Sequence, residues 1–306
     1  MRILVTGGAG FIGSHLVDKL ITQNHRVIVV DNLSKGKKGF VNPRAKFYKL
    51  DIISPEIKEV FKKEKPCFVF HLAAQKSVPF SLKYPLSDAQ TNIVGSVNVI
   101  ESCLTCRIEK FIFTSTGGAV YGHASQIPSP ESTLALPDSP YGLSKLTIDN
   151  YLEKYYAKVK KLNYISLRLA NVYGPRQDPA GEAGVIAIFV NNLLHNKPCY
   201  INGSGKQTRD FIYVDDVVSA CLKSIHKGQG IYNIGTGKET LVNQLFQLII
   251  KMMNIQKTAR HRPMIFGEVK RSVLKINKAK KELNWSPQFN LEQGIDRTID
   301  YFLSLL

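Results

Sequence analysis

Apolar and polar positions follow two alternating patterns along the first 170 residues. Short runs rich in Val, Ile, Phe and Tyr predict buried strands, at Arg2–Thr6, Arg26–Asp31, Ala45–Leu50, Cys67–Leu72, Lys110–Ser115 and Asn163–Leu169. Between most of them, apolar residues recur at helical spacing, in Phe11–Ile21, Pro55–Lys63, Asp88–Cys106 and Tyr141–Lys160. This alternation predicts an α/β fold with a doubly wound parallel sheet covered on both faces.

The pattern loosens after Asn171. Loops rich in Gly and Pro separate predicted helices near 183–196, 215–226, 241–253 and 291–304. We therefore expect a Rossmann-type domain over residues 1–170 and a smaller, mixed α/β substrate lobe over 171–306. The chain is expected to cross back to the first domain near 205–235.

Composition narrows the class of protein. The 306 residues are 44% hydrophobic, enough for a large core, and no stretch approaches the roughly 20 apolar residues of a membrane span. The first strand leads at once into glycines, which leaves no room for a signal peptide. Five cysteines form no disulfide framework, and no second pair answers the metal-like spacing of Cys103 and Cys106. We expect a cytoplasmic protein without a membrane partner or a metal.

The chain carries a net charge of +17. Such a balance could bind nucleic acid, but the lysine clusters lie beside turns and on polar helix faces without interleaved aromatic residues. We expect solvated surfaces and no nucleic-acid partner. The same positive field would attract an anionic substrate.

A glycine-rich turn lies between the first predicted strand and helix. Gly7 allows the tight turn, Gly10 lets the backbone approach a pyrophosphate, and Gly13 lets the helix pack on the strand. The positive end of the helix would then face the phosphates. A dinucleotide site is the predicted outcome.

Asp31 ends the second strand, where it can accept hydrogen bonds from both adenosine ribose hydroxyls and repel a 2′-phosphate. No arginine follows it closely, so NAD is favoured over NADP. Asp51 could accept from the adenine amino group or cap a helix, and the sequence leaves both possibilities open. His71 is expected to be a packed residue at a strand end. The other candidate cofactor-binding residues are Phe11, Ile12, Asn32, Ser34, Gly36, Ile52, Leu72, Ala73 and Ala74.

Tyr141 and Lys145 are four residues apart on a predicted helix and so share a face. A phenol with a pKa of about 10 needs help to act as a base at neutral pH, and a neighbouring ammonium favours its ionised form. The run Ser115-Thr116-Gly-Gly118 follows a strand upstream of this pair. These groups predict proton-transfer chemistry.

Together these motifs resemble the extended short-chain dehydrogenase/reductases, and specifically the UDP-glucose 4-epimerase group. The resemblance covers nearly the whole chain, and its most specific blocks are Asn171-Val-Tyr-Gly-Pro-Arg176 and Thr208-Arg-Asp-Phe-Ile-Tyr-Val-Asp-Asp216. It implies that Tyr141 takes the proton of the sugar 4-hydroxyl while C4 gives hydride to NAD, forming a transient 4-keto sugar. Lys145 would hold the nicotinamide ribose and help to lower the pKa of the tyrosine. Thr116, or alternatively Ser115, would bind the sugar oxygen.

The resemblance also implies a binding site for the nucleotide sugar. Asn171 would hold a phosphate or the sugar, Arg209 the pyrophosphate, and Gln207 and Gly203 the uridine; Lys76 is a further candidate. Many relatives carry Arg-Pro-Gly-Glu where this chain has Ile265-Phe-Gly-Glu268, so Arg262 or Arg271 would have to replace the missing arginine. Ser272 would border the sugar's 2-substituent and leave room for an N-acetyl group.

The residues that follow the threonine distinguish the epimerase group from related enzymes with other activities. The related 4,6-dehydratases follow their threonine with an Asp-Glu pair, whereas this chain has Gly117-Gly118, which disfavours elimination. The remaining alternatives are an epimerase of a uronic-acid sugar, a reductase that releases NADH, and a non-catalytic NAD-sensing protein. The resemblance also implies a homodimer joined through the helices around 88–106 and 141–160.

Overall fold

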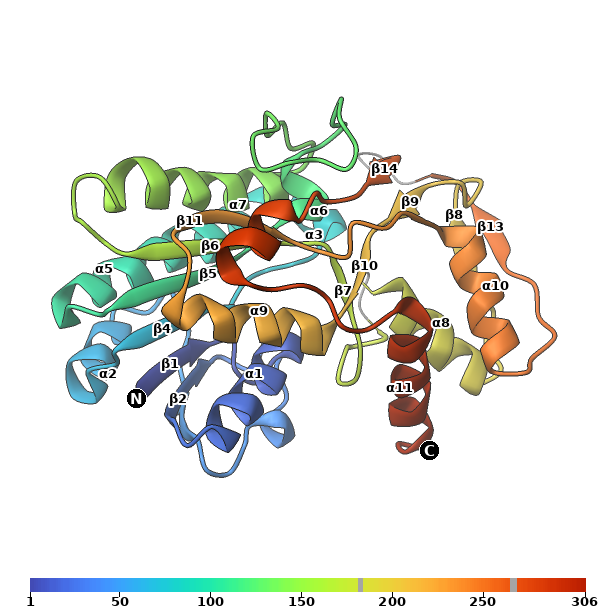
Figure 1. Ribbon diagram of the computed structural model, residues 1–306. Coiled ribbons are helices and arrows are strands. Elements are labelled where there is room, and N and C mark those ends of the chain that lie inside the picture. Colours follow the sequence, from blue (N-terminus) through green and yellow to red (C-terminus); the bar gives the residue numbers. More distant parts are fainter. Residues whose placement is uncertain (181–183, 265–268) are drawn as a thin grey trace.

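The computed structural model describes residues 1–180, 184–264 and 269–306 (Figure 1). Its central sheet has seven strands, in the order β11-β6-β5-β4-β1-β2-β3, and every pairing is parallel. The strands are β1 (Arg2–Thr6), β2 (Arg26–Asp31), β3 (Lys46–Lys49), β4 (Phe68–His71), β5 (Lys110–Thr116), β6 (Tyr164–Leu169) and β11 (Gly230–Ile234). The six predicted strands are confirmed to within one residue at each end. The sequence did not predict β11.

Helices cover both faces of this sheet. On one face α1 (Phe11–Thr22) packs beside α9 (Val214–His226), and on the other α2 (Ile57–Glu64) and α5 (Ser96–Cys106) lie near α7 (Pro140–Asn150). Each face buries its own hydrophobic cluster, represented by Leu16 and Val217 on the first face and by Val99 and Ile148 on the second. The doubly wound architecture is therefore confirmed (Figure 1).

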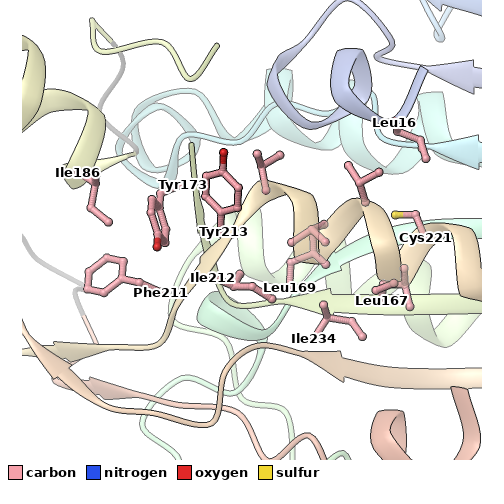
Figure 2. Packing of buried hydrophobic residues seen from close by; sticks show 14 of the residues in the cluster. Leu16, Leu167, Leu169, Tyr173, Ile186, Phe211, Ile212, Tyr213, Cys221 and Ile234 are labelled. Atoms are coloured by element: carbon pink, nitrogen blue, oxygen red, sulfur yellow. The ribbon is translucent and has the colours of Figure 1, made fainter. Parts of the chain in front are cut away.

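The first cluster continues without a break into the second lobe (Figure 2). Leu167 and Leu169 on β6 lead to Tyr173, Phe211 and Tyr213, which lie on two strands that pair with each other. The lobe's elements are β7 (Asn171–Tyr173), α8 (Val185–Leu194), β8 (Tyr200–Asn202), β9 (Thr208–Arg209), β10 (Phe211–Tyr213), β12 (Thr240–Leu241), α10 (Val242–Met252), β13 (Arg260–Arg262), β14 (Arg271–Ser272), η4 (Ala279–Leu283) and α11 (Leu291–Leu303). One continuous core therefore joins the regions before and after residue 170.

Two of the predicted long helices contain a π-helical turn. The helix expected over 88–106 begins earlier and runs through α4 (Pro85–Ala89), η2 (Gln90–Gly95) and α5. The helix expected over 141–160 continues from α7 into η3 (Tyr151–Tyr156). Short helices complete the fold at η1 (Lys38–Phe40), α3 (Val78–Lys83) and α6 (Gly117–Val120). In the part of the chain described above, every helix is too short or too polar to cross a bilayer.

Candidate active site

The strand order reverses between β1 and β4, and ligands of such sheets bind at the carboxyl ends of the strands flanking this point. Gly7 has φ +72°, and a Cβ there would lie 2.6 Å from the amide nitrogen of Ala73. A Cβ on Gly13 would lie 2.1 Å from the carbonyl oxygen of Gly7. Gly10 is the N-cap of α1, and its first turn, with Phe11 and Ile12, has neither a side-chain cap nor an acidic residue. This uncapped positive helix end fits a pyrophosphate.

Asp31 is held at the end of β2, facing the glycine turn. Its Oδ2 accepts from the amide of Ala9 at 3.0 Å and its Oδ1 from the amide of Leu33 at 2.8 Å. A Cβ on Gly36 would lie 2.8 Å from Oδ1, so this glycine leaves space beside the carboxylate. Each oxygen retains acceptor capacity, which fits the two hydroxyls of an adenosine ribose.

Asn32 and Asp51 meet beyond the ends of β2 and β3. The Asn32 amide donates to Asp51 Oδ2 at 2.7 Å, and Asn32 Oδ1 accepts from the backbone of Ser34. Asp51 Oδ1 accepts from the amide of Ile53 at 2.9 Å, which closes a turn. Helix α2 begins later, after Glu56, so the structure does not show Asp51 as its cap. Ile52 is buried, and its side chain fills the space where a Cβ on Gly95 would lie.

The segment Leu72–Ala74 follows β4 and is half-buried beside the glycine turn. His71 at the end of β4 is fully buried and hydrogen-bonds the hydroxyls of Thr6 at 2.7 Å and Ser96 at 2.9 Å. Burial, with a smaller contribution from Lys145, lowers the pKa of His71 to about 3. The expectation of a packed histidine is confirmed.

Tyr141 lies in the first turn of α7, which Ser139 caps and Pro140 begins. The Thr116 side chain, at the end of β5, lies close enough to the phenol to act on its pKa. Burial raises the pKa of Tyr141 to about 12, Thr116 opposes this rise, and Asp88 adds to it. Burial outweighs the effect of Thr116, so the phenol of the chain alone is protonated at neutral pH.

Lys145 is buried one helical turn after Tyr141. Its Nζ donates to the carbonyl of Thr114 at 2.9 Å and lies 4.6 Å from the ring centroid of Phe113. Burial lowers the pKa of Lys145 to about 8, while Asp149 and Asp88 act to raise it. The ammonium is therefore held in place by a carbonyl and an aromatic face.

Ser115 points away from the phenol, into the protein. It is 4% exposed, and its hydroxyl donates to Asp149 Oδ2 at 3.1 Å. Asp149 also accepts from Arg168 Nε at 2.9 Å and from Ser166 at 2.6 Å. Of the two predicted alternatives, the geometry places Thr116 against Tyr141 and Ser115 in a buried network. The sequence analysis missed this network, although a charged Arg168 inside an apolar strand was a signal for it.

Asn171 joins the same site from the start of β7. A Cβ on Gly118 would lie 3.6 Å from Asn171 Oδ1 and 3.9 Å from Thr116 Oγ1, so both side chains border Gly118. A Cβ on Gly117 would lie 2.5 Å from Leu274 Cδ1. Lys76 lies near enough to Asp178 and Lys35 for both to influence its pKa, which partial desolvation lowers.

Four of the predicted nucleotide-binding residues, Gly203, Gln207, Arg209 and Ser272, lie on the short strands β9 and β14 or in the loop between β8 and β9. Ser272 on β14 pairs with Arg209 on β9, whose guanidinium donates to the carbonyl of Thr208. Gln207 donates to the carbonyl of Asn202 at 2.8 Å, and Gly203 has φ +62°. The structure thus brings Arg209 and Ser272 together.

Both candidate replacements for the missing arginine already have partners. Arg271 forms two bonds with Glu239, at 2.6 and 2.8 Å, and this contact lowers the pKa of Glu239 to about 2. Arg262 lies over the ring of Tyr200, 3.3 Å from its centroid. The stretch Ile265-Phe-Gly-Glu268 lies outside the described residues.

Asp210 was not among the predicted residues, although it lies inside the block Thr208–Asp216. It is 1% exposed and accepts from the backbone amides of Thr236, Gly237 and Leu274. Burial raises the pKa of Asp210, and these bonds oppose the rise. Its carboxylate fixes Leu274, the residue that fills the space at Gly117.

A glycine turn at the point where the strand order reverses, beside a Tyr–Lys pair, defines a dinucleotide-dependent enzyme of the α/β class. The chain belongs to the NAD dependent epimerase/dehydratase family, whose sequence model matches residues 3–235. Membership confirms the predicted family and its cofactor, NAD.

Relatives match this chain over its whole length. The UDP-glucose 4-epimerase of Mycolicibacterium smegmatis is 39% identical over 309 residues, which is 99% of this chain and 98% of the relative. The structure of the UDP-glucose 4-epimerase of Thermotoga maritima, solved with UDP-glucose, is 48% identical and covers 100% of this chain and 99% of its own, with a TM-score of 0.98. The UDP-N-acetylglucosamine 4-epimerase of Methanobrevibacter ruminantium M1, in complex with UDP-N-acetylmuramic acid, is 35% identical with a TM-score of 0.94 and covers 100% of this chain and 99% of its own.

Proposed function

We propose that this chain is an NAD-dependent 4-epimerase of UDP-hexoses that interconverts UDP-glucose and UDP-galactose through a transient 4-keto sugar. The observation that carries the proposal is the Tyr141 phenol, which lies near the side chain of Thr116 and is followed one turn later by a buried Lys145. Two glycines follow Thr116 in the place of an acid. Two relatives that match this chain over nearly their full length are named UDP-glucose 4-epimerases, which supports this assignment.

Each side chain of the site has a role in this reaction. Bound NAD supplies the acceptor, and later the donor, of the hydride at the sugar C4. Tyr141 takes the proton of the 4-hydroxyl and later returns it, while Thr116 holds the same oxygen. Lys145 binds the nicotinamide ribose, and the positive charge of the oxidised nicotinamide would favour the ionised phenol. Ser115 supports the end of β5 from the buried side.

The remaining predicted residues form the two binding sites. For the cofactor, we propose Gly7, Gly10, Phe11, Ile12, Gly13, Asp31, Asn32, Ser34, Gly36, Asp51, Ile52, Leu72, Ala73 and Ala74. For the UDP-sugar, we propose Lys76, Asn171, Gly203, Gln207, Arg209, Arg271 and Ser272. Arg271 would have to exchange its contact with Glu239 for the diphosphate, or bind it with its remaining donors.

The absence of an acid beside Thr116 favours epimerisation over elimination. Neither Gly117 nor Gly118 can transfer a proton, and Leu274 fills the space that a side chain at 117 would need. A 4-keto sugar held here would lack the acid and base that remove water from C5 and C6. It would therefore be reduced again at C4.

The experiment is incubation of the purified protein with UDP-galactose and identification of the product by NMR. We expect UDP-glucose without net formation of NADH, and Tyr141→Phe should lower kcat at least ~100-fold because the proton acceptor is gone. The variant should keep its fold and bind NAD. Full activity of Tyr141→Phe would overturn the mechanism. Release of NADH, or turnover of UDP-glucuronate alone, would identify the alternative reductase or uronic-acid epimerase.

We further propose that the enzyme accepts UDP-GlcNAc and UDP-GalNAc. Ser272 is a small, half-buried residue paired with Arg209, and the Methanobrevibacter ruminantium relative is named for an N-acetylated sugar. Ser272→Tyr should lower kcat/KM for the acetylated sugars by at least about tenfold more than for UDP-galactose, because the phenol would occupy the space of the acetyl group. Equal losses for both sugars would refute the assignment.

We also propose a homodimer that works in the cytoplasm. Exposed apolar side chains gather on the helices around 85–106 and 140–159, and such patches mark protein interfaces. They are Leu86, Val94, Leu143, Tyr151, Tyr155 and Val159. All five cysteines are unpaired, which suits a reducing compartment.

A further inference from the structure

Asp88 on α4 is a fully buried carboxylate at the back of the catalytic helix. Its Oδ2 accepts from the hydroxyl of Ser144 at 2.7 Å, and Ser144 lies on α7 immediately before Lys145. Its Oδ1 accepts from Gln75 at 2.7 Å and from Asn92 at 2.9 Å. Asp88 therefore links its own helix to the segment after β4 and to α7.

Two of these segments lead directly to candidate site residues, Lys76 and Lys145. Gln75 comes directly before Lys76, and its backbone amide and carbonyl are both bonded to the side chain of Asn92. Asn92 lies in the π-helical turn η2, the kind of turn that is frequent at functional sites. A shift of Asp88 would therefore move both α7 and the segment that leads to Lys76.

Asp88 also differs from the other buried carboxylate near Lys145. Asp149 is ion-paired with Arg168 at 2.9 Å. Among the residues described by the structure, no lysine or arginine forms an ion pair with Asp88. The cation on which Asp88 acts is Lys145, which follows Ser144 on α7.

We propose that Asp88 is a positioning residue for the catalytic pair: it anchors α7 to the segment before Lys76 and supplies the negative charge that balances the Lys145 ammonium. The same charge opposes ionisation of Tyr141. The kinetic test of this proposal rests on the proposed epimerase function. The effect of the Asp88 charge on Lys145 can be measured on the folded protein without substrate.

Few other titratable groups face this pair. Asp149 lies one turn beyond Lys145 on α7, and His71 on β4 is neutral and bonded on both ring nitrogens. The remaining charged residues on helices packed against α7 are exposed; they are Lys83, Glu153 and Lys154. Among the residues that the structure describes, Asp88 and Asp149 are the two buried carboxylates that act on the pKa of Lys145, and the substitution removes the charge of one of them.

Asp88→Asn tests the charge without changing the shape. The amide oxygen can still accept from Gln75 and Asn92, and the amide nitrogen can donate to the Ser144 hydroxyl, which rotates to accept. Because Asp88 raises the pKa of both Tyr141 and Lys145, its neutralisation should lower both. Both limbs of the pH profile of kcat should move to lower pH, by about one unit.

A second readout does not depend on activity. NMR of lysine labelled with 13C at Cε, assigned with Lys145→Met, should show Lys145 titrating near pH 8 in the wild type and about one unit lower in Asp88→Asn. Asp88→Ser, a smaller charge-free variant, should give the same shift and replaces Asp88→Asn if that chain does not fold. Unchanged titration of Lys145 in a folded charge-free variant would overturn the proposal, whereas an inactive wild type would overturn only the proposed function.

Two matched variants separate charge from anchoring. Ser144→Ala keeps the charge but removes the bond to α7, so we expect a lower kcat, by about fivefold or more, with the limbs of the pH profile in place. Glu101→Gln makes the same chemical change as Asp88→Asn at a carboxylate on α5 that accepts from Tyr156. It should alter neither kcat nor the titration of Lys145. A Ser144→Ala enzyme with wild-type kcat would refute the anchoring role.

Discussion

Gly117 and Gly118 stand side by side, yet only one of them lacks room for a side chain. A Cβ on Gly117 would lie 2.5 Å from Leu274, which is buried and fixed through Asp210, whereas the nearest atom at Gly118 would be 3.6 Å away. Neither has a positive φ. We expect Gly117→Ala to lower the free energy of unfolding by about 1–3 kcal/mol, and Gly118→Ala to change it by no more than ~0.5 kcal/mol.

Urea unfolding of the two variants makes this comparison directly, with each serving as the control for the other. Equal unfolding midpoints would show that Leu274 gives way without cost. The result bears on chemistry too. Position 118 could accept an acidic side chain facing Thr116 and Asn171, whereas position 117 could do so only if Leu274 moved.

The role of a residue could be predicted where all the residues that act together lie in one short motif. The Tyr141–Lys145 pair is set by a spacing of four on one helix, and the geometry places Thr116 at the phenol. The choice between Thr116 and Ser115 required the direction of each side chain at the end of β5. Asp88 could not be found from the sequence, because its partner Ser144 is 56 residues away and belongs to another helix.

At the scale of elements, Lys110 closes the end of a helix that is distant in sequence. It begins β5, is 6% exposed, and donates to the carbonyls of Ser224, Lys227 and Gly228 at 3.0–3.2 Å, at the end of α9. Lys110→Met would take the lysine donor away from these carbonyls, of which that of Ser224 belongs to a buried residue. We expect a loss of about 2 kcal/mol in the free energy of unfolding.

Thermal or urea unfolding measures the loss, and Lys223→Met is the matched control. Lys223 is exposed on the same helix, so its substitution should change stability by at most ~0.5 kcal/mol. If both variants unfold alike, Lys110 does not stabilise α9. Burial lowers the pKa of Lys110, so part of the benefit of its bonds is offset by desolvation.

Elements were predictable where their hydrophobic pattern is long enough to be periodic. The first six strands and the helices around them met this condition. The strands β9, β12 and β14 have two residues each, too few for any alternation, and depend on pairing with distant segments. The π-helical turns η2 and η3 leave the apolar pattern nearly unchanged, so the sequence predicted unbroken helices.

At the scale of the whole molecule, the chain returns to its first sheet after entering the second lobe. β11 pairs with β6 and α9 packs on α1, so residues 214–234 lie with the N-terminal part (Figure 1). The hydrophobic cluster that runs from α1 to Phe211 joins both parts (Figure 2). A boundary at residue 170 therefore remains a proposal about function rather than a break in packing. The sequence predicted the return, but only pairing reveals the seventh strand.

The apolar side chains on α4, η2, α7 and η3 bear on the assembly of the whole molecule. α4 and η2 both pack against α7, so Val94 and Tyr151 belong to one continuous helical layer. We expect a dimer in sedimentation velocity experiments, and Val94→Glu should weaken it about tenfold or more because a charge would be buried in an apolar interface. Leu134→Glu, at a loop residue that is 74% exposed, should leave the dimer intact. A wild type that is monomeric at all concentrations would refute the dimer, and equal effects of the two substitutions would place the contact elsewhere.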